Sequence, residues 1–376
     1  MSEPDFTEPD RLEGAPHPRH THQLIGQEPA EAEFLQAFNL GRLHHAWLIS
    51  GPGGVGKATL AWKIARFLLA QPAEDQGGVL AETAPQTLDV PADHPVTRRL
   101  AALSDSGLYL CRRPWDHDKS RLKQNITVDE IRKLKGFFGL SAADGGRRVV
   151  IIDAADDMNS NAANALLKIL EEPPANTTIL LVAHRPSHLL ATIRSRCRAL
   201  KCQKLPQNLL MQAVGNAGVQ VDAAPDKLGQ LADGSVGGAI GLLSGEGLAI
   251  YDNLLALLKS APRMDRNLAH ALANGCVGKN NEPRYTLTLR LVLIMLARLG
   301  KFGATPKADR VNFAEEAAVF EDKSRNVRDA RKWAELVQTI QSRTLHARAV
   351  NLDPASVILD ILLKLDQASA RPANVI

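Results

Sequence analysis

One stretch near the start of the chain, GPGGVGKAT at residues 51–59, constrains the fold more than any other part of the sequence. Before it, HAWLIS at residues 45–50 has the continuous apolar character of a buried strand. After its glycines, KATLAWKIARFLLA at residues 57–70 places apolar side chains at helical spacing. A strand, a GxxxxGK loop and a helix in this order predict a phosphate-binding loop.

The residues of this loop have distinct physical roles. Its glycines allow a tight turn in which several backbone N–H groups face inward, and the start of the following helix adds its positive end. The lysine would reach the outer phosphates of a nucleotide. A glycine-rich turn that holds no ligand is the alternative. We assign to the nucleotide site Gly51, Gly53, Gly54, Val55, Gly56 and Lys57.

The position after the lysine weakens the prediction of catalysis. A phosphate-binding loop usually has Ser or Thr there to hold magnesium, but this chain has Ala58. Thr59 is one residue further along the helix, so its side chain points about 100° away. A second buried strand, RRVVIID at residues 147–153, ends in Asp153, at the place of a magnesium-holding aspartate. The loop therefore predicts a fold more securely than an activity, and the sequence leaves magnesium binding open.

Strands and helices alternate around these two motifs. TTILLVA at residues 177–183 predicts a third buried strand, and RALKCQKL at residues 198–205 predicts the last one. Between the second and third strands, NSNAANALLKILEEPP at residues 159–174 predicts a helix that ends at its two prolines. This alternation favours an α/β domain whose parallel sheet is covered on both faces.

The chain is expected to have four parts. Residues 1–23 are polar and rich in proline, which predicts a loose tail. Residues 24–205 form the α/β core, residues 206–263 a small helical lid, and residues 264–376 an all-helical domain without predicted strands.

Composition excludes several other classes of protein. The formal net charge of +4 is small for 376 residues, and aromatic residues are only 4%, so base stacking is not expected to be the main activity. The four cysteines are scattered, which argues against a disulfide framework, and no histidines or cysteines stand at metal-ligand spacing. No apolar stretch of about 18 residues occurs. We expect a cytoplasmic protein without a metal site and without membrane contact.

A further basic motif, IRSRC at residues 193–197, lies just before the last predicted strand. Arg194, Arg196 and Arg198 form a cluster that has two ordinary interpretations: a solvated turn or a contact with nucleic-acid phosphates.

Three segments together resemble the clamp-loader branch of the AAA+ ATPases: RLHHAWLISGPGGVGKATLA, DAADDMNSNAANALLKILEEPP and LLATIRSRCRAL. The resemblance covers residues 24–205, and beyond residue 206 it extends only to size and helical character. It implies an AAA+ core, a lid and a collar that assembles subunits into a ring. It also implies that Arg196 reaches the nucleotide of a neighbouring subunit, with Ser195 and Cys197 as its supports.

The chain departs from the hydrolysing members of that family at three places. They carry Ser or Thr at Ala58, a glutamate at Ala154 and an arginine at Gly237. Many members also carry a zinc module of four cysteines, but between residues 58 and 147 this chain has only Cys111. An irregular insertion from residue 71 to about 105 stands in that region. We therefore expect no zinc, and ATP or phosphate binding without turnover stays open.

Three functions remain open from the sequence. The first is a structural and regulatory subunit that holds a clamp-loader ring together and offers Arg196 to a neighbour. Its partners would be the gamma/tau and delta subunits, and through the assembled ring the sliding clamp and primer-template DNA. The second is an active motor ATPase, and the third is a nucleic-acid-binding module outside replication. Whether the chain is itself an enzyme is thus left undecided.

Overall fold

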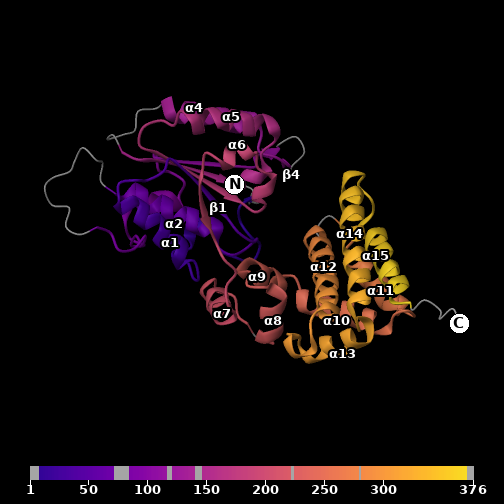
Figure 1. Ribbon diagram of the computed structural model, residues 1–376. Coiled ribbons are helices and arrows are strands. Elements are labelled where there is room, and N and C mark those ends of the chain that lie inside the picture. Colours follow the sequence, from indigo (N-terminus) through magenta and orange to yellow (C-terminus); the bar gives the residue numbers. More distant parts are fainter. Residues whose placement is uncertain are drawn as a thin grey trace, which may run out of the picture. The chain divides into compact units, whose positions relative to one another are not determined.

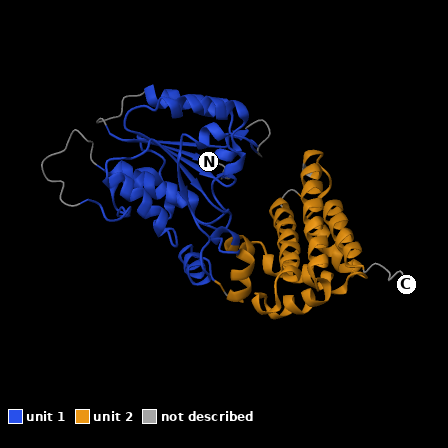
Figure 2. Cartoon of the chain, viewed as in Figure 1, with its two compact units in different colours: residues 1–220, 233–238 blue, residues 221–232, 239–376 orange. Residues whose placement is uncertain are grey.

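The computed structural model describes residues 8–71, 84–116, 121–139, 146–221, 224–278 and 281–370. The chain divides into two compact units, which are coloured separately in Figure 2. Unit 1 comprises residues 1–220 and 233–238, and unit 2 comprises residues 221–232 and 239–376.

A five-stranded parallel sheet forms the centre of unit 1 (Figure 1). The central strands are apolar along almost their whole length because both faces of the sheet are covered. Arg112 lies opposite Asp153 in the register of neighbouring strands, so two charged residues end at the same edge of the sheet. In spatial order the strands are β2 (Leu108–Arg112), β5 (Arg148–Asp153), β6 (Thr177–Ala183), β1 (Ala46–Ser50) and β7 (Arg198–Lys201).

Helices cover both faces of this sheet (Figure 1). Side chains alternate along β1: Leu48 joins the core beneath α4 and α5, while Trp47 packs on Phe34 of α1 with ring centroids 4.9 Å apart. This arrangement confirms the predicted α/β core with a parallel sheet. One face carries α4 (Val128–Gly139), α5 (Ser160–Glu171) and α6 (Ala191–Arg194); the other carries α1 (Glu28–Asn39) and α2 (Lys57–Ala70), with α3 (Pro95–Ala101) beside α2.

The predicted strands are present with small differences in length. The last one is shorter than expected: β7 ends at Lys201, after which Cys202 N still donates to Ser50 O at 2.8 Å. A short antiparallel pair, β3 (Trp115–Asp116) and β4 (Arg121–Leu122), was not expected from the sequence. Two-residue strands carry too little periodicity to be recognised in a sequence.

The expectation of a loose tail does not hold for residues 8–23. His17 is only 2% exposed, and its segment includes a 3₁₀ turn at Pro18–His20. The polar residues that suggested a loose tail are paired with charged groups of the core, which a local pattern cannot reveal. Residues 1–7 lie outside the described ranges.

The insertion from residue 71 to about 105 is described from residue 84 onward. Leu88 is buried, and Asp89 forms an ion pair with Lys63 of α2 at 2.9 Å. Thr97 of α3 donates to Pro91 O at 3.0 Å. These contacts fix the second half of the insertion against unit 1.

The regular elements among the described residues of unit 2 are all helices, as predicted. Its two longest helices, α12 (Glu282–Ala304) and α14 (Val327–Ala349), pack together around buried residues that include Met295 and Trp333. The boundaries predicted at residues 206 and 264 stay predictions. The other helices after the sheet are α7 (Gln207–Asn216) in unit 1, α9 (Val236–Ser244), which begins in unit 1, and α8 (Pro225–Ala232), α10 (Gly247–Ser260), α11 (Arg266–Asn274), α13 (Ala314–Lys323) and α15 (Pro354–Ser369).

Candidate nucleotide site and arginine finger

The glycine loop lies between β1 and α2, as the sequence predicts. Gly54 adopts a φ of +72°, which side chains rarely tolerate. A Cβ atom at this position would also lie 2.5 Å from Ser235 Oγ, so the loop requires glycine here for two independent reasons. Gly56 precedes the first turn of α2 with a φ of +100°.

Lys57 is directed back onto its own loop. Its Nζ donates to Gly51 O at 2.9 Å and also to Pro52 O, and the residue is only 3% exposed. Burial lowers the pKa of Lys57, and the neighbouring Cys202 and Asp153 partly offset that effect. The ammonium group of Lys57 thus donates its hydrogen bonds to loop carbonyls, the same donors that would bind a nucleotide phosphate.

Asp153, at the end of β5, is the acidic residue of the predicted site. It is 7% exposed, and burial raises the pKa of Asp153 to about 7, helped by the negative charge of Asp10 and opposed by Lys57. The structure therefore brings the two predicted charged residues of the site, Lys57 and Asp153, close enough to influence each other electrostatically.

The acidic residues that follow Asp153 have structural partners. Asp156 accepts from His184 N at 2.9 Å and from Arg185 N at 3.2 Å, which joins the end of β5 to the end of β6. Asp157 forms an ion pair with Arg113 at 3.2 Å. Neither replaces the glutamate that is missing at Ala154.

Residues 235–237 pack directly on the glycine loop. Ser235 Oγ donates to Gly53 O at 2.8 Å, and Gly237 N donates to Gly54 O at 2.9 Å. A Cβ atom at Gly237 would lie 3.0 Å from the Cα atom of Gly54. The position at which the family resemblance implies an arginine is thus a backbone-to-backbone contact.

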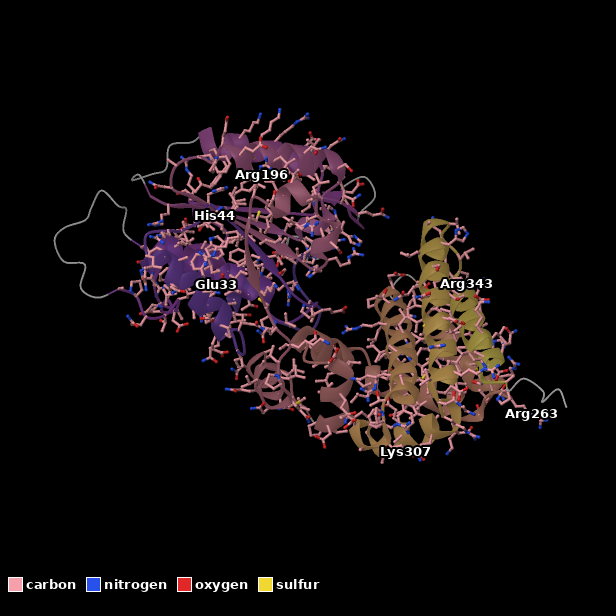
Figure 3. The ribbon with its side chains drawn as sticks, viewed as in Figure 1. Glu33, His44, Arg196, Arg263, Lys307 and Arg343 are labelled. Atoms are coloured by element: carbon pink, nitrogen blue, oxygen red, sulfur yellow. The ribbon has the colours of Figure 1, made fainter. Side chains whose placement is uncertain are left out.

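Arg196, labelled in Figure 3, lies two residues after the end of α6 and is exposed at 36% of its side chain. Its Nη2 lies 2.8 Å from Glu171 Oε1, and its Nη1 donates to Thr192 O at 3.0 Å. These partners belong to α5 and α6, whereas Lys57 bonds to the glycine loop. The structure therefore presents Arg196 apart from the bonding partners of the chain's own nucleotide site.

The two predicted supports of Arg196 have different surroundings. Ser195 Oγ donates to Thr192 O at 3.1 Å, which helps to close the short helix α6. Cys197 packs against the core beneath α5, and burial raises the pKa of its thiol to about 12. A thiol in this state is an inert packing group. The predicted role of both residues as supports of Arg196 stays a prediction.

Three further residues near the site were not predicted from the sequence. Asp10 and His17 lie in the segment that was expected to be loose. Asp10 pairs with Arg112 of the sheet, and the ring of His17 packs on Trp62 of α2. Arg112, at the end of β2, binds Asp10. Asp10 and Arg112 lie 102 positions apart in the chain, so no local spacing could have identified this pair.

The described residues show neither a metal cluster nor a single membrane-spanning helix. None of their His, Cys, Asp and Glu side chains form a group of three or more that could hold a metal ion. No one helix among them is long and apolar enough to cross a membrane; only the bent pair α9–α10, at 81°, passes by length and composition.

A parallel sheet, a GxxxxGK loop after β1 and an aspartate at the end of β5 define a domain of the phosphate-binding-loop class, to which the AAA+ ATPases belong. The family model described as "DNA polymerase III, delta subunit" matches residues 26–206. In this region the chain belongs to that clamp-loader family.

Curated relatives agree with this assignment. The chain is 42% identical over 159 residues to DNA polymerase III subunit delta' of Pseudomonas aeruginosa, covering 42% of this chain and 43% of the relative. It is 29% identical over 238 residues to subunit delta' of Escherichia coli, covering 63% and 66%. It is 33% identical over 214 residues to subunit gamma/tau of Mycobacterium tuberculosis (strain ATCC 25618 / H37Rv), covering 54% and 32%. The matched region thus spans between about a third and two thirds of the length of these relatives.

Proposed function

We propose that the chain acts as a delta-prime subunit of a DNA polymerase III clamp loader. In this role it is a structural stator of the ring that loads the sliding clamp onto primed DNA, and it offers Arg196 to the ATP of a neighbouring subunit. Its proposed partners are the gamma/tau and delta subunits, with the clamp and primer-template DNA contacted through the assembled ring. We place this function in the cytoplasm.

The observation that carries the proposal is the contrast between Arg196 and Lys57. Arg196 is accessible, bears a permanent charge and is held only by an exposed ion pair and one carbonyl. Lys57 is buried and bonded to its own loop. One cation is therefore free to serve a partner's phosphate, while the other is retained within the chain.

The chain's own site supports a role without hydrolysis. Ala58 offers no hydroxyl to magnesium, and Ala154 offers no carboxylate to activate water. Gly237 contacts the glycine loop through its backbone and has no side chain to reach a phosphate. Three separate groups needed for turnover are thus missing. Arginine fingers acting in trans accelerate hydrolysis by about 10³- to 10⁵-fold, so one side chain can govern the partner's reaction.

The test is the DNA-stimulated ATPase of the reconstituted loader. Arg196→Ala is expected to reduce it by about tenfold or more, because the neighbouring nucleotide loses its finger. Arg194→Ala, which removes a nearby exposed arginine, is the matched control and should retain the activity. Assembly of each complex is measured by size-exclusion chromatography. Unchanged ATPase in an intact Arg196→Ala complex would contradict the proposal.

The second candidate is a motor subunit, which the identity to gamma/tau relatives favours. It requires turnover by the isolated chain and loss of that turnover in Lys57→Ala. The two functions are therefore distinguished by the ATPase rate of the purified chain alone. A substantial rate that depends on Lys57 would support the motor, and no rate above a protein-free blank would support the stator.

A further inference from the structure

The segment from residue 8 to residue 24, here called the strap, contacts several of the elements that surround the glycine loop. Near its beginning it binds Arg112 at the end of β2. Its middle packs on α2, the helix that follows the loop. Its end reaches Gly56, the residue directly before that helix. All of these contacts lie within unit 1.

The acidic part of the strap lies at the edge of the sheet where Asp153 ends β5. The carboxylate of Asp10 is 0% exposed, accepts from Arg112 Nη1 at 2.5 Å, and lies 3.1 Å from His17 Nε2. Glu8 adds a second carboxylate, whose Oε1 accepts from the same Arg112 nitrogen at 3.2 Å. Arg112 stands opposite Asp153 in the sheet, and the charge of Asp10 contributes to the raised pKa of Asp153. The strap thus places buried negative charge beside the predicted magnesium-holding aspartate.

Two leucines of the strap approach the glycine loop from different sides. Leu12 Cδ2 would be 3.3 Å from a Cβ atom at Gly237, the residue whose N–H binds Gly54 O. Leu24 Cδ1 would be 2.7 Å from a Cβ atom at Gly56. The strap therefore lies close both to Gly237, which bonds to the loop, and to Gly56, which precedes α2.

Buried side chains of α2 hold the strap in place. The ring of Trp62 meets the ring of His17 edge to face, with centroids 5.9 Å apart. Arg66, which is buried, donates through Nη2 to Thr21 O at 2.7 Å. A buried guanidinium needs such an acceptor, because an unpaired buried charge is strongly destabilising. The anchoring is thus part of the folded core.

We propose that the strap is an intramolecular cover of the nucleotide site, and that its displacement exposes Lys57 to the phosphates of a nucleotide. With the strap in place, Glu8 and Asp10 hold Arg112 in ion pairs, so this cation is not available to a polyphosphate. Lys57 is then directed to Gly51 O and Pro52 O. Without it, the GxxxxGK loop keeps its backbone donors and its lysine. The proposal concerns the chain's own site and is independent of the role proposed for Arg196.

The test measures binding of MgADP and MgATP to the purified chain by titration calorimetry. Deletion of residues 2–16 removes both carboxylates and Leu12, and Arg112→Ala releases the acidic end while keeping the full length. If the cover is closed in at least nine-tenths of molecules, a change that uncovers the site should lower the apparent Kd by about tenfold or more. Because Ala58 and Ala154 are unchanged, the uncovered chain is expected to bind without turnover.

Two controls locate the effect. Adding Lys57→Ala to the deletion should abolish the gained binding, which assigns it to the glycine loop. Arg99→Ala, which breaks an ion pair with Asp105 in the same unit, should leave the affinity at that of the unaltered chain. Arg112→Ala also serves as the readout if the deletion variant does not fold. Equal affinities of the full chain and the folded variants, or gained binding that survives Lys57→Ala, would overturn the proposal.

Discussion

Arg196 Nη2 lies 2.8 Å from Glu171 Oε1, and this ion pair joins the proposed finger to the end of α5. Both side chains are substantially exposed, at 36% and 48%. Exposed ion pairs contribute only about 0–1 kcal/mol, because water screens the charges and ordering two long side chains costs entropy. Glu171 can therefore orient Arg196 in the free chain without preventing it from leaving for a stronger anion such as a phosphate.

Replacing Glu171 tests this weak coupling. Glu171→Gln is expected to change the free energy of unfolding by no more than about 1 kcal/mol. The DNA-stimulated ATPase of the reconstituted loader should stay within about twofold of the unaltered complex, because the finger itself is intact. A loss of ATPase as large as that of Arg196→Ala would instead show that Glu171 is required to position the finger.

The raised pKa of Asp153 predicts a specific dependence of the unfolding free energy on pH. Its pKa is raised from 3.8 to about 7, so between these values the folded chain holds a proton that the unfolded chain has released. Stability is therefore lost as pH rises through this window and changes little above it. Asp153→Asn removes the titrating group. As pH rises from 4 to 7.5, the unfolding free energy of this variant should therefore increase by on the order of 2–4 kcal/mol relative to that of the unaltered chain.

Urea unfolding at a series of pH values measures that difference. Asp129→Asn is the matched control, since Asp129 is exposed at 73% of its side chain and lies on the surface of α4. The control should follow the pH profile of the unaltered chain. Parallel profiles for Asp153→Asn and the unaltered chain would contradict the assignment of the raised pKa to Asp153.

The close packing of Gly237 on the glycine loop predicts that this position will not readily accept the arginine implied there by the family resemblance. A Cβ atom there would lie 3.0 Å from Gly54 Cα, closer than side chains normally come to backbone. Gly237→Arg is therefore expected to lower the free energy of unfolding by about 1–3 kcal/mol, the typical cost of overpacking. Gly241→Arg, in the same helix but with nothing within 4 Å of its Cβ position, should cost less. Thermal unfolding compares the two, and equal losses would argue against the close contact.

Glu316 holds a buried network within unit 2. It is 0% exposed and accepts a hydrogen bond from Arg298 Nε at 2.8 Å. It also accepts hydrogen bonds from the side chains of Tyr251 and Asn312. Glu316→Ala would leave Arg298, whose side chain is only 18% exposed, without its carboxylate, at a cost of about 3–5 kcal/mol in unfolding free energy. Glu315→Ala, at the exposed neighbouring position, should change it by no more than about 0.5 kcal/mol. Denaturant unfolding of both variants measures the contrast, and a small effect of Glu316→Ala would mean that the network is not needed for stability.

Local patterns in the sequence determined the core of unit 1. The apolar runs that became β1, β5 and β6 are long enough to be recognised, and each buries both of its faces. The glycine loop and the aspartate at the end of β5 were predicted with them, because strand ends and loops carry their own residue signature. The roles of Arg196, Ser195 and Cys197 came from the family resemblance and stay proposals.

Only the tertiary structure decided what surrounds these residues. It packed residues 8–23 onto the core and joined Asp156 to the backbone at the end of β6. It also buried Glu316 against Tyr251 of α10 and Arg298 of α12. The physical reason is the same in each case: hydrophobic periodicity is set by neighbours along the chain, whereas the partner of a buried charge is set by whichever distant segment the fold brings beside it.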